Sequence, residues 1–503
     1  MKNPRDVAIA DDRAGILTYE RVLAGVLIQA KRFAALPEKN VGLLMPTSAG
    51  GSMALVALIA AGKVPIVLNW TTGPANLAHA VKLMGVKHVV SARAFVNRMG
   101  IELAGVEFVY LDDLIKHVGK FEKLTTLLSI RWFPGMVRGR IAKVGPDDPA
   151  VVLFTSGSEK APKAVPLTHR NLLTNERAGA SAFKLTRHDS ILSFMPLFHS
   201  FGLSVTGLLP LLAGIKTVVH PDPREAGKLV RKIAAYKPTL LLSTPTFLSY
   251  LLERGTKDDL ASLKSLMVGA EKCSAAIYAK CQEMIPGAVL VEGYGITECS
   301  PAVTLNRPDN NRPGTVGQAV DSVELAVVDL DSGAEVARGK QGMLLVAGVS
   351  VFAGYVGDGV ESPFREHKGK RWYVTGDLVE MDADGFVTFK GRLKRFVKAG
   401  GEMVSLPALE EPFAQAFPVG EEGPRVAVEG VELGAKARVV LFTTEPITLL
   451  DANQRLKQAG FHGVMRLDEV RKVDKIPTLG SGKVDYKVLR AQIAKETPEP
   501  VAT

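Results

Sequence analysis

Residues 151–166 of the chain read VVLFTSGSEKAPKAVP. The first four residues are apolar and predict the end of a buried strand, and the polar residues Thr155–Ser158 follow directly. Such a loop presents backbone N–H groups and hydroxyls to an anion, and Lys163 adds a positive charge. The stretch therefore predicts a phosphate-binding loop, although the Gly-x4-Gly-Lys-[Ser/Thr] spacing of a Walker A loop is absent. The alternative is an ordinary flexible turn before a helix that begins near Thr168.

Short apolar runs alternate with stretches of helical periodicity on both sides of this loop, which is typical of parallel α/β units. We predict strands at residues 41–45, 64–68, 88–90, 190–195, 217–220, 239–243 and 265–268. We predict helices at residues 18–36, 52–61, 74–84, 202–212, 224–236 and 245–253.

The alternation of helical and strand patterns ends after about Asn306. β-rich runs at residues 323–329 and 343–347 are separated by polar turns, and Asp382–Gly385 is a hairpin signal between two short apolar runs. This part predicts an antiparallel sheet or a small barrel. From Arg395 onward a smaller, charge-balanced segment is long enough to fold as a separate unit.

The length and composition set further bounds. A chain of 503 residues is too long for one hydrophobic core, so we expect two or three units. The three cysteines are dispersed without metal-ligand spacing, which indicates a reducing compartment. The N-terminus does not resemble a signal peptide, and no uninterrupted apolar run of about 18 residues is present. We expect a cytoplasmic protein, with peripheral contact at the inner membrane surface as an option.

Much of the net charge of +10 lies in residues 114–144. Basic residues there outnumber the single acidic residue Glu122, and apolar residues such as Trp132 are interleaved with them. One interpretation is a docking surface for a membrane or an acidic partner. The other is an amphipathic connector whose apolar side packs inward. Nucleic acid is a poor candidate partner, because the sequence has no stacking platform of aromatic and basic residues.

A second polar cluster follows the apolar run at residues 288–291. Tyr294, Thr297 and Glu298 stand at the end of a predicted strand, where α/β sheets bind ligands. Tyr294 can stack on a base, Thr297 can bond a phosphate, and Glu298 can hold Mg²⁺ through a carboxylate oxygen. Farther on, Asp377 occupies a tight turn, where a carboxylate can bind two ribose hydroxyls.

Eight motifs resemble, in sequence order, those of the adenylate-forming superfamily of acyl-CoA synthetases, luciferases and adenylation domains. They are TSGSEKAPKA, PLFHSFG, GAE, EGYGITE, YVTGDL, GRLKRF, GGEMVS and PTLGSGK. The resemblance covers nearly the whole chain. Within the superfamily it is nearest to acyl-[acyl-carrier-protein] synthetases, which include the synthetase half of bifunctional acyltransferase/acyl-ACP synthetases. The chain has no His-x4-Asp acyltransferase signature, so we expect a free-standing synthetase.

The resemblance implies a reaction and an architecture. A medium- or long-chain fatty acid would be activated by ATP to an acyl-adenylate, and the acyl group would pass to the phosphopantetheine thiol of acyl carrier protein. ATP and Mg²⁺ are the implied cosubstrate and metal. The fold class is α/β. Residues 1–393 would form a large N-terminal domain of α/β subdomains with a small β-barrel-like subdomain, and residues 394–503 a small mobile α+β domain.

The resemblance also implies a role for each site residue. The residues that would cradle the β- and γ-phosphates are Thr155, Ser156, Gly157, Ser158 and Lys163. Those that would surround the adenine and ribose are Gly269, Ala270, Glu271, Glu292, Tyr294, Gly295, Asp377 and Arg392. Thr297 and Glu298 would serve the phosphates and Mg²⁺, with Glu298 as the metal ligand. Lys483 would neutralise the charge that develops during adenylation.

Three further positions follow from the resemblance. His199 would lie at the acyl pocket near the carboxylate, and the alternative is an ordinary buried histidine. Lys394 would be the hinge between the domains, and Gly401 would let the phosphopantetheine arm pass close to the backbone. The acyl chain would run along residues 198–212, where we expect small residues to leave room for a tunnel. These small residues are Gly202, Ser204, Gly207 and Gly214.

Two alternatives remain open at this point. A fatty acyl-CoA ligase would use the thiol of CoA in place of the carrier protein. A non-catalytic acyl- or nucleotide-binding protein is the other, since the phosphate loop departs from the family pattern at Glu159, Lys160 and Ala164. If the usual glycines there need a positive φ, the loop is strained or displaced.

Overall fold

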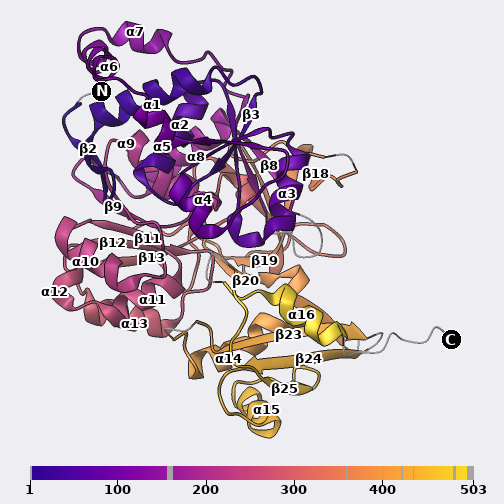
Figure 1. Cartoon of the computed structure of the whole chain (residues 1–503). Helices are drawn as coiled ribbons and strands as arrows, with labels where there is room; N and C mark the ends of the chain where they lie inside the picture. Colours follow the sequence, from indigo (N-terminus) through magenta and orange to yellow (C-terminus); the bar gives the residue numbers. More distant parts are fainter. Residues whose placement is uncertain are drawn as a thin grey trace.

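The computed structural model describes residues 3–155, 162–357, 359–399, 402–420, 423–433, 436–479 and 483–495. Its large N-terminal domain contains three sheets, and a smaller C-terminal domain lies at one end of the molecule (Figure 1). The α/β class predicted from the sequence is confirmed. Within the described ranges, no helix has both the length and the apolar character needed to cross a membrane.

The stretch at residues 151–166 forms one edge of a six-stranded sheet of order β6-β5-β3-β4-β7-β8. β7 (Pro149–Phe154) and β8 (Ala164–Thr168) pair antiparallel, and the other neighbours pair in parallel. The predicted helix after Thr168 is α8 (His169–Ala182), which Thr168 and Asn171 cap reciprocally. The other elements of this layer are β3 (Asn40–Leu44), α2 (Ala49–Ala60), β4 (Val64–Val67), α3 (Pro74–Leu83), β5 (His88–Ser91), α4 (Arg93–Met99) and β6 (Glu107–Tyr110).

A nine-stranded sheet of order β15-β14-β13-β12-β11-β9-β10-β1-β2 forms the second layer. The strands from β1 to β13 along this order pair in parallel and are mostly apolar, because helices cover both faces. The strands are β1 (Val7–Asp11), β2 (Gly15–Thr18), β9 (Ser190–Ser193), β10 (Lys216–Val219), β11 (Leu240–Ser243), β12 (Ser265–Gly269), β13 (Val289–Gly295), β14 (Ala302–Leu305) and β15 (Gln318–Ala319). The helices include α1 (Tyr19–Phe33), α10 (Ala226–Tyr236), α11 (Pro245–Arg254), α12 (Lys257–Leu260) and α13 (Ala275–Met284).

The predicted antiparallel part is the third sheet, of five strands. Its strands are β16 (Val323–Val328), β17 (Gln341–Gly348), β18 (Phe364–His367), β19 (Lys370–Met381) and β20 (Val387–Arg392). The predicted hairpin at Asp382–Gly385 joins β19 to β20, with Asp382 N–H donating to the Phe386 carbonyl at 3.0 Å. This pairing sets Asp377 directly opposite Arg392. Asp377 therefore lies within strand β19, and the prediction that it occupies a tight turn is wrong.

The C-terminal domain follows the short 3-10 helix η4 (Leu393–Arg395) and has apolar clusters of its own. Its sheet has the order β23-β24-β25, and a two-stranded ribbon, β21-β22, precedes it. The elements are β21 (Phe396–Ala399), β22 (Glu402–Ser405), α14 (Leu406–Ala416), β23 (Val426–Leu433), β24 (Lys436–Thr443), α15 (Leu449–Gln458), β25 (Glu469–Lys472) and α16 (Tyr486–Lys495). The separate clusters agree with a unit that begins near residue 394, and that boundary stays a prediction.

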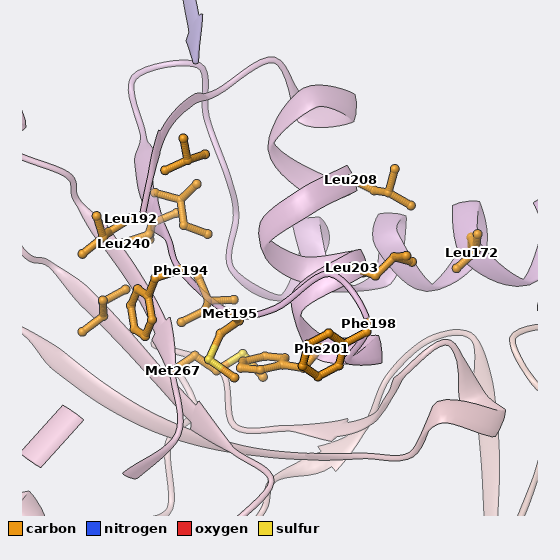
Figure 2. Close-up of a cluster of buried hydrophobic side chains, with 14 of the residues drawn as sticks. Leu172, Leu192, Phe194, Met195, Phe198, Phe201, Leu203, Leu208, Leu240 and Met267 are labelled. Atoms are coloured by element: carbon orange, nitrogen blue, oxygen red, sulfur yellow. The ribbon is translucent and has the colours of Figure 1, made fainter. Parts of the chain in front are cut away.

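The prediction of one helix at residues 202–212 is wrong in detail. A π-helical segment, η2 (Gly202–Leu208), comes first, and α9 (Leu209–Ala213) follows. Pro210 has no N–H, so the Thr206 carbonyl loses its usual helical donor, and the Ser193 hydroxyl donates to that carbonyl at 3.2 Å. Figure 2 shows Leu203 and Leu208 among the side chains of the buried cluster that also contains Phe194 and Met267.

The expectation that small residues of this segment leave open space is also wrong for two glycines. A Cβ on Gly202 would lie 2.1 Å from the Pro196 carbonyl oxygen, and one on Gly207 would lie 3.1 Å from the Leu197 side chain. Gly202 is needed because the backbone is packed closely there, and a side chain at Gly207 would require Leu197 to shift.

Residues 114–144 contain helices that the sequence did not predict. They are α5 (Leu111–Lys116), α6 (Lys120–Trp132) and α7 (Pro134–Gly139). α6 packs against α1, and both α6 and α7 lie at the end of the molecule opposite the C-terminal domain (Figure 1).

Candidate active site

The candidate active site starts at the carboxyl ends of β12 and β13. These strands pair in parallel with Gly269 opposite Gly293, and a Cβ on Gly269 would lie 3.0 Å from the Gly293 carbonyl oxygen. The close approach brings Ala270 and Glu271, which follow β12, to the same sheet edge as the segment that follows β13. This edge is where parallel sheets bind ligands.

The start of α11 holds Glu271. Thr244 caps α11 by accepting a hydrogen bond from Phe247 N–H at 3.3 Å, and Pro245 occupies the first helical position. Thr246 then donates to the Glu271 carboxylate from its hydroxyl at 2.6 Å and from its N–H at 3.3 Å. Burial raises the pKa of Glu271, although these bonds and the charge of Lys483 oppose the rise. Sequence reasoning missed Thr246, because the TPTF segment carries no signal beyond a helix start.

Lys483 of the C-terminal domain lies within electrostatic reach of this carboxylate. Its ammonium group acts electrostatically on both Glu271 and His199, so three distant parts of the chain converge. Burial lowers the pKa of Lys483, and the Glu271 carboxylate opposes that effect. The residues that precede it, 480–482, lie outside the described residues.

His199 is uncharged in this arrangement. Burial, and secondly the charge of Lys483, lower the pKa of His199 to about 3. Its Nδ1 accepts from the Phe201 N–H at 3.3 Å, so the proton of the neutral ring is on Nε2. Near pH 7 the imidazole is therefore a hydrogen-bond donor at Nε2 that adds no charge to the site.

Tyr294, Asp377 and Arg392 form a second cluster. The Tyr294 hydroxyl donates to Asp377 Oδ2, and Arg392 Nε lies 3.3 Å from Asp377 Oδ1. Burial raises the pKa of Asp377, against the opposing effects of Arg392 and Tyr294. The Tyr294 ring packs at a tilt against Phe389, with 5.8 Å between ring centroids. The structure thus brings together three of the residues that we predicted for adenine and ribose.

Glu298 and Thr297 follow in the 3-10 helix η3 (Thr297–Cys299). Glu298 is buried, and its Oε1 accepts from the Tyr355 hydroxyl at 2.7 Å. Thr297 donates to the Ser200 hydroxyl at 3.3 Å, which connects it to the loop of His199. Sequence reasoning missed Tyr355, which stands outside the eight motifs, and Ser200, which the PLFHSFG motif contains.

The structure describes both ends of the phosphate loop, at Thr155 and at Lys163. Thr155 N–H donates to the Lys163 carbonyl at 3.0 Å, which closes the loop. The Lys163 ammonium lies over the Tyr355 ring, 4.5 Å from its centroid, and so belongs to the same cluster as Glu298. Ser156, Gly157 and Ser158 lie outside the described residues.

The Glu292 carboxylate already has partners within the chain. It accepts from the Tyr278 hydroxyl at 3.0 Å, from Cys273 N–H at 3.2 Å and from Gly314 N–H at 3.3 Å. These bonds connect β13 to two neighbouring loops and to α13. A contact between Glu292 and the adenine amino group stays a prediction.

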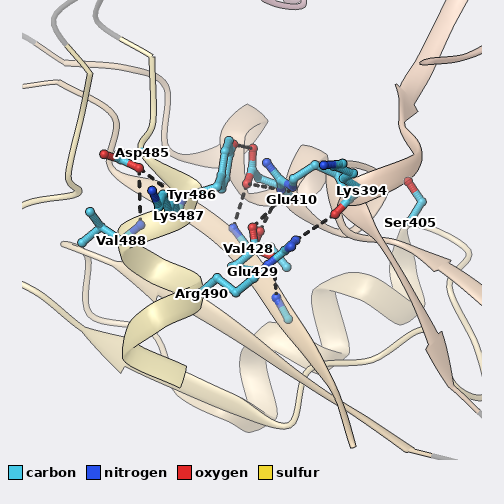
Figure 3. A network of polar contacts seen from close by, with 12 residues as sticks. Lys394, Ser405, Glu410, Val428, Glu429, Asp485, Tyr486, Lys487, Val488 and Arg490 are labelled. Atoms are coloured by element: carbon cyan, nitrogen blue, oxygen red, sulfur yellow. Dashed lines mark hydrogen bonds and ion pairs between the residues drawn. The ribbon is translucent and has the colours of Figure 1, made fainter. Parts of the chain in front are cut away.

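Lys394 lies within η4, at the junction of the two domains. The Arg490 guanidinium donates to the Lys394 carbonyl at 2.8 Å and to Glu429 at 2.9 Å (Figure 3). The next residue, Arg395, lies over the Tyr486 ring at 3.3 Å from its centroid. The end of η4 is therefore bound to α16 of the C-terminal domain. Gly401 lies outside the described residues.

A family model described as AMP-binding enzyme matches residues 1–356 of the chain. The chain belongs to this family. The matched residues include every described residue of the site except Asp377, Arg392 and Lys483, which lie beyond residue 356. Asp377 accepts from Tyr294 and pairs with Arg392, and the charge of Lys483 acts on Glu271, so these three residues join the rest of the chain to the AMP-binding part.

Known proteins resemble this AMP-binding enzyme over nearly its whole length. The long-chain-fatty-acid–CoA ligase of Yersinia pestis is 28% identical over 494 residues, which cover 91% of this chain and 85% of that protein. ATP-bound MatB from Rhodopseudomonas palustris has a TM-score of 0.81 and 25% identity, covering 98% of this chain and 96% of that one. O-succinylbenzoate coenzyme A synthetase (MenE) from Bacillus subtilis, in complex with ATP and magnesium ion, has a TM-score of 0.81 at 20% identity and covers 98% and 97%.

ATP and Mg²⁺ suit the donor set of this AMP-binding enzyme. Among the described residues no three His, Cys, Asp or Glu side chains gather as a metal cage. Mg²⁺ usually binds one or two carboxylates together with substrate phosphates. Glu298, beside the Lys163 end of the phosphate loop, supplies such a carboxylate. Glu298 would hold the ion, which would neutralise phosphate charge when bound.

Proposed function

We propose that the protein is an AMP-forming acid–thiol ligase that activates fatty acids. The observation that carries the proposal is the convergence of Lys483 from the C-terminal domain with Glu271 and His199 of the N-terminal domain. In the first step a substrate carboxylate attacks the α-phosphorus of ATP, the bond to the β-phosphate oxygen breaks, and pyrophosphate leaves. In the second step a thiol attacks the acyl carbonyl of the adenylate, loses its proton, and AMP leaves.

The described residues suit the first step. The Lys483 ammonium is a compact positive charge that would meet the negative charge growing on the attacking carboxylate and the α-phosphate. A neutral His199 would donate a hydrogen bond from Nε2 to the substrate carboxylate. Because the ring is uncharged, it would not neutralise the negative charge that the carboxylate needs for its attack. Lys163 would pair with the phosphates at the other end of the site. ATP binding would also compensate the burial cost that lowers the pKa of Lys483.

An apolar cavity supports a fatty acyl substrate. It lies between α8, η2 and the nine-stranded sheet. Val205 and Leu209 from the predicted acyl segment line it, as does Met267 of β12. Glu176, at 5% exposure, is the one ionisable side chain in its lining. The Yersinia pestis relative is named for long-chain fatty acids, which agrees with such a lining.

The Asp377 cluster gives a prediction for nucleotide binding. Asp377→Asn should weaken ATP binding about tenfold, because the neutral amide loses charge-assisted bonds to the ribose and to Arg392. Isothermal titration calorimetry with ATP and Mg²⁺ measures the change. Asp331→Asn, at an exposed turn after β16, is the matched control and should bind as the wild type does. Equal affinity of the two variants would contradict a ribose role for Asp377.

Glu176 gives a prediction for stability. Burial raises its pKa from the ordinary value of 4.5 to about 8. The folded state thus holds the proton more tightly than the unfolded state, and this stabilisation is complete below pH 4.5 and is lost as the pH rises through about 8. The slope approaches about 1.4 kcal/mol per pH unit between these values. Glu176→Gln removes this pH-dependent contribution to stability. The free energy of unfolding of the variant, relative to that of the wild type, should therefore increase from pH 5.5 to 7.5.

Urea denaturation at several pH values, followed on the N-terminal domain, checks this expectation. Glu366→Gln on the exposed face of β18 is the control and should follow the wild-type pH profile. A Glu176→Gln profile parallel to that of the wild type would mean that the carboxyl is ionised in the folded protein.

The acceptor thiol is the finer part of the proposal. The motif resemblance favours the phosphopantetheine of acyl carrier protein, and the name of the Yersinia pestis relative favours CoA. Acyl carrier protein and CoA present the same phosphopantetheine thiol. The choice of acceptor therefore depends on how the protein contacts the rest of the acceptor molecule. A net charge of +10 would attract an acidic carrier protein, and it would equally attract the phosphates of CoA.

Thioester formation tests the proposal. Purified protein, ATP, Mg²⁺ and fatty acids of graded length are incubated with holo-acyl carrier protein or with CoA in separate tubes. Thioester on the carrier protein alone supports a carrier-protein synthetase, and thioester on CoA alone supports a CoA ligase. Pyrophosphate release that requires a fatty acid would exclude the non-catalytic alternative. No product in any tube would contradict the ligase proposal.

A further inference from the structure

Helix α6 exposes most of its large apolar side chains and buries two small polar ones, unlike an ordinary surface helix. Its buried positions are Thr126 and Ser129, next to Glu122, and this side packs against α1. Its exposed side carries four large apolar side chains, Phe121, Leu124, Leu128 and Trp132. Leu127 and Ile130 are half-buried. Surface helices normally turn the apolar stripe to the core. The alternative of a connector with an inward apolar side fits Leu127 and Ile130 but not the four exposed apolar side chains of α6.

Two ion pairs fix this orientation. Near the start of α6, both carboxylate oxygens of Glu122 accept from Arg32 of α1, at 2.9 and 2.8 Å. Near its end, Arg131 donates twice to Glu20 of α1, at 2.8 Å each. Bidentate pairs of this kind define an orientation as well as adding energy. The apolar side is thus held away from the protein.

The exposed apolar row continues beyond α6. Phe133 and Met136 are more than half exposed, and Ile141 follows after α7. We call the exposed side chains of Phe121, Leu124, Leu128, Trp132, Phe133 and Met136 the α6–α7 face. With Phe121 at 80% and Trp132 at 72% exposure, two large aromatic side chains lie almost wholly in solvent. Large apolar side chains gathered on the surface in this number indicate an interaction surface.

Basic residues border the α6–α7 face. Lys120, Lys123, Arg138 and Lys143 are exposed, and in the described part of the chain none of them takes part in an ion pair. Glu122 is the single acidic residue between Lys120 and Lys143, and Arg32 neutralises it. The border is therefore positively charged without internal compensation.

We propose that the α6–α7 face docks on the surface of an anionic lipid bilayer. Tryptophan and phenylalanine favour the depth of the lipid headgroups, and lysine and arginine around them pair with anionic lipid. The face lies on helices that project from one end of the molecule (Figure 1). The C-terminal domain at the opposite end would stay free to move. The inference uses no residue of the active site and does not depend on the proposed substrate.

Vesicle co-sedimentation tests the proposal with the full chain. Vesicles of phosphatidylcholine with about 30% phosphatidylglycerol are compared with vesicles of phosphatidylcholine alone. The wild type should bind the anionic vesicles, bind the neutral ones at least about tenfold more weakly, and lose affinity at high salt. Trp132 fluorescence should shift to shorter wavelength on binding, because this side chain leaves water.

Two variants and two matched controls locate the surface. Phe121→Ser with Trp132→Ser should weaken binding at least about tenfold, since two large side chains no longer enter the bilayer. Lys120→Glu with Lys123→Glu should weaken it about twentyfold or more. Leu450→Ser in α15 removes a side chain of 78% exposure elsewhere, and Lys257→Glu with Lys264→Glu reverses exposed charges near α12. Both controls should bind as the wild type does.

The outcomes separate the possible occupants of this face. Absence of wild-type binding to anionic vesicles would overturn the proposal, as would unchanged binding of both variants. If sedimentation velocity shows a wild-type dimer that Phe121→Ser with Trp132→Ser dissociates, the face joins two copies and the proposal is wrong. Thermal melts of every variant are recorded, and an unchanged Tm shows that lost binding is not lost folding.

Discussion

Lys483→Ala should lower the rate of acyl-adenylate formation by about a thousandfold. The ammonium is the one positive charge of the C-terminal domain that we find within electrostatic reach of Glu271 and His199 among the described residues. A preorganised charge aimed at developing negative charge contributes about 100- to 1000-fold to a rate in comparable sites. Its loss should leave the substrate carboxylate and the α-phosphate uncompensated. Pre-steady-state pyrophosphate release measures this step.

The second half-reaction separates this role from general damage. If acyl-adenylate is supplied together with the thiol, thioester formation by Lys483→Ala should stay within about twofold of the wild type. Lys487→Ala, an exposed lysine of α16 in the same domain, is the matched control and should behave normally in both assays. Equal loss of both half-reactions in Lys483→Ala would contradict the assigned role.

Lys394→Pro should show the reverse pattern, with adenylation retained and thioester formation about a hundredfold slower. Lys394 lies in η4, and the backbone φ of a 3-10 helix is close to the value that proline imposes. Proline therefore suits the arrangement seen here, in which Lys483 is in the site. A second arrangement of the domains would need a different backbone angle at the hinge. Proline strain of about 3 kcal/mol corresponds to a factor of about a hundred.

The hinge assignment has a direct control. Lys394→Ala keeps the freedom of the backbone and should preserve both half-reactions. The Arg490 bond to the Lys394 carbonyl is available in both variants, since neither changes that oxygen. Unchanged overall turnover of Lys394→Pro would mean that the domains pivot elsewhere or do not move.

The parallel layers of the fold could be predicted from local pattern alone. Strands such as residues 239–243 and 265–268 are short apolar runs between helices, and the structure has β11 and β12 there. The π-helix at Gly202 could not be predicted in this way. It depends on Pro210, on the Ser193 hydroxyl and on close backbone packing, and these come together only in three dimensions.

The site could be predicted only in part. The motifs named Tyr294 and Asp377, yet the bond between them joins positions 83 residues apart, and no local pattern encodes it. Tyr355 and Thr246 were missed because each supports a motif residue from outside the motifs. The outward orientation of the apolar side chains of α6 could not be predicted from the sequence either, since it depends on Glu20 and Arg32 of another helix.

ATP–pyrophosphate exchange tests the central claim most directly. Purified protein is incubated with ATP, Mg²⁺ and labelled pyrophosphate, with and without a long-chain fatty acid, and the label in ATP is counted. Reversible adenylation of the fatty acid predicts that label enters ATP only when the fatty acid is present, and that Lys483→Ala abolishes the exchange. Absence of exchange with every fatty acid, or cleavage of ATP to ADP and phosphate, would contradict an AMP-forming ligase.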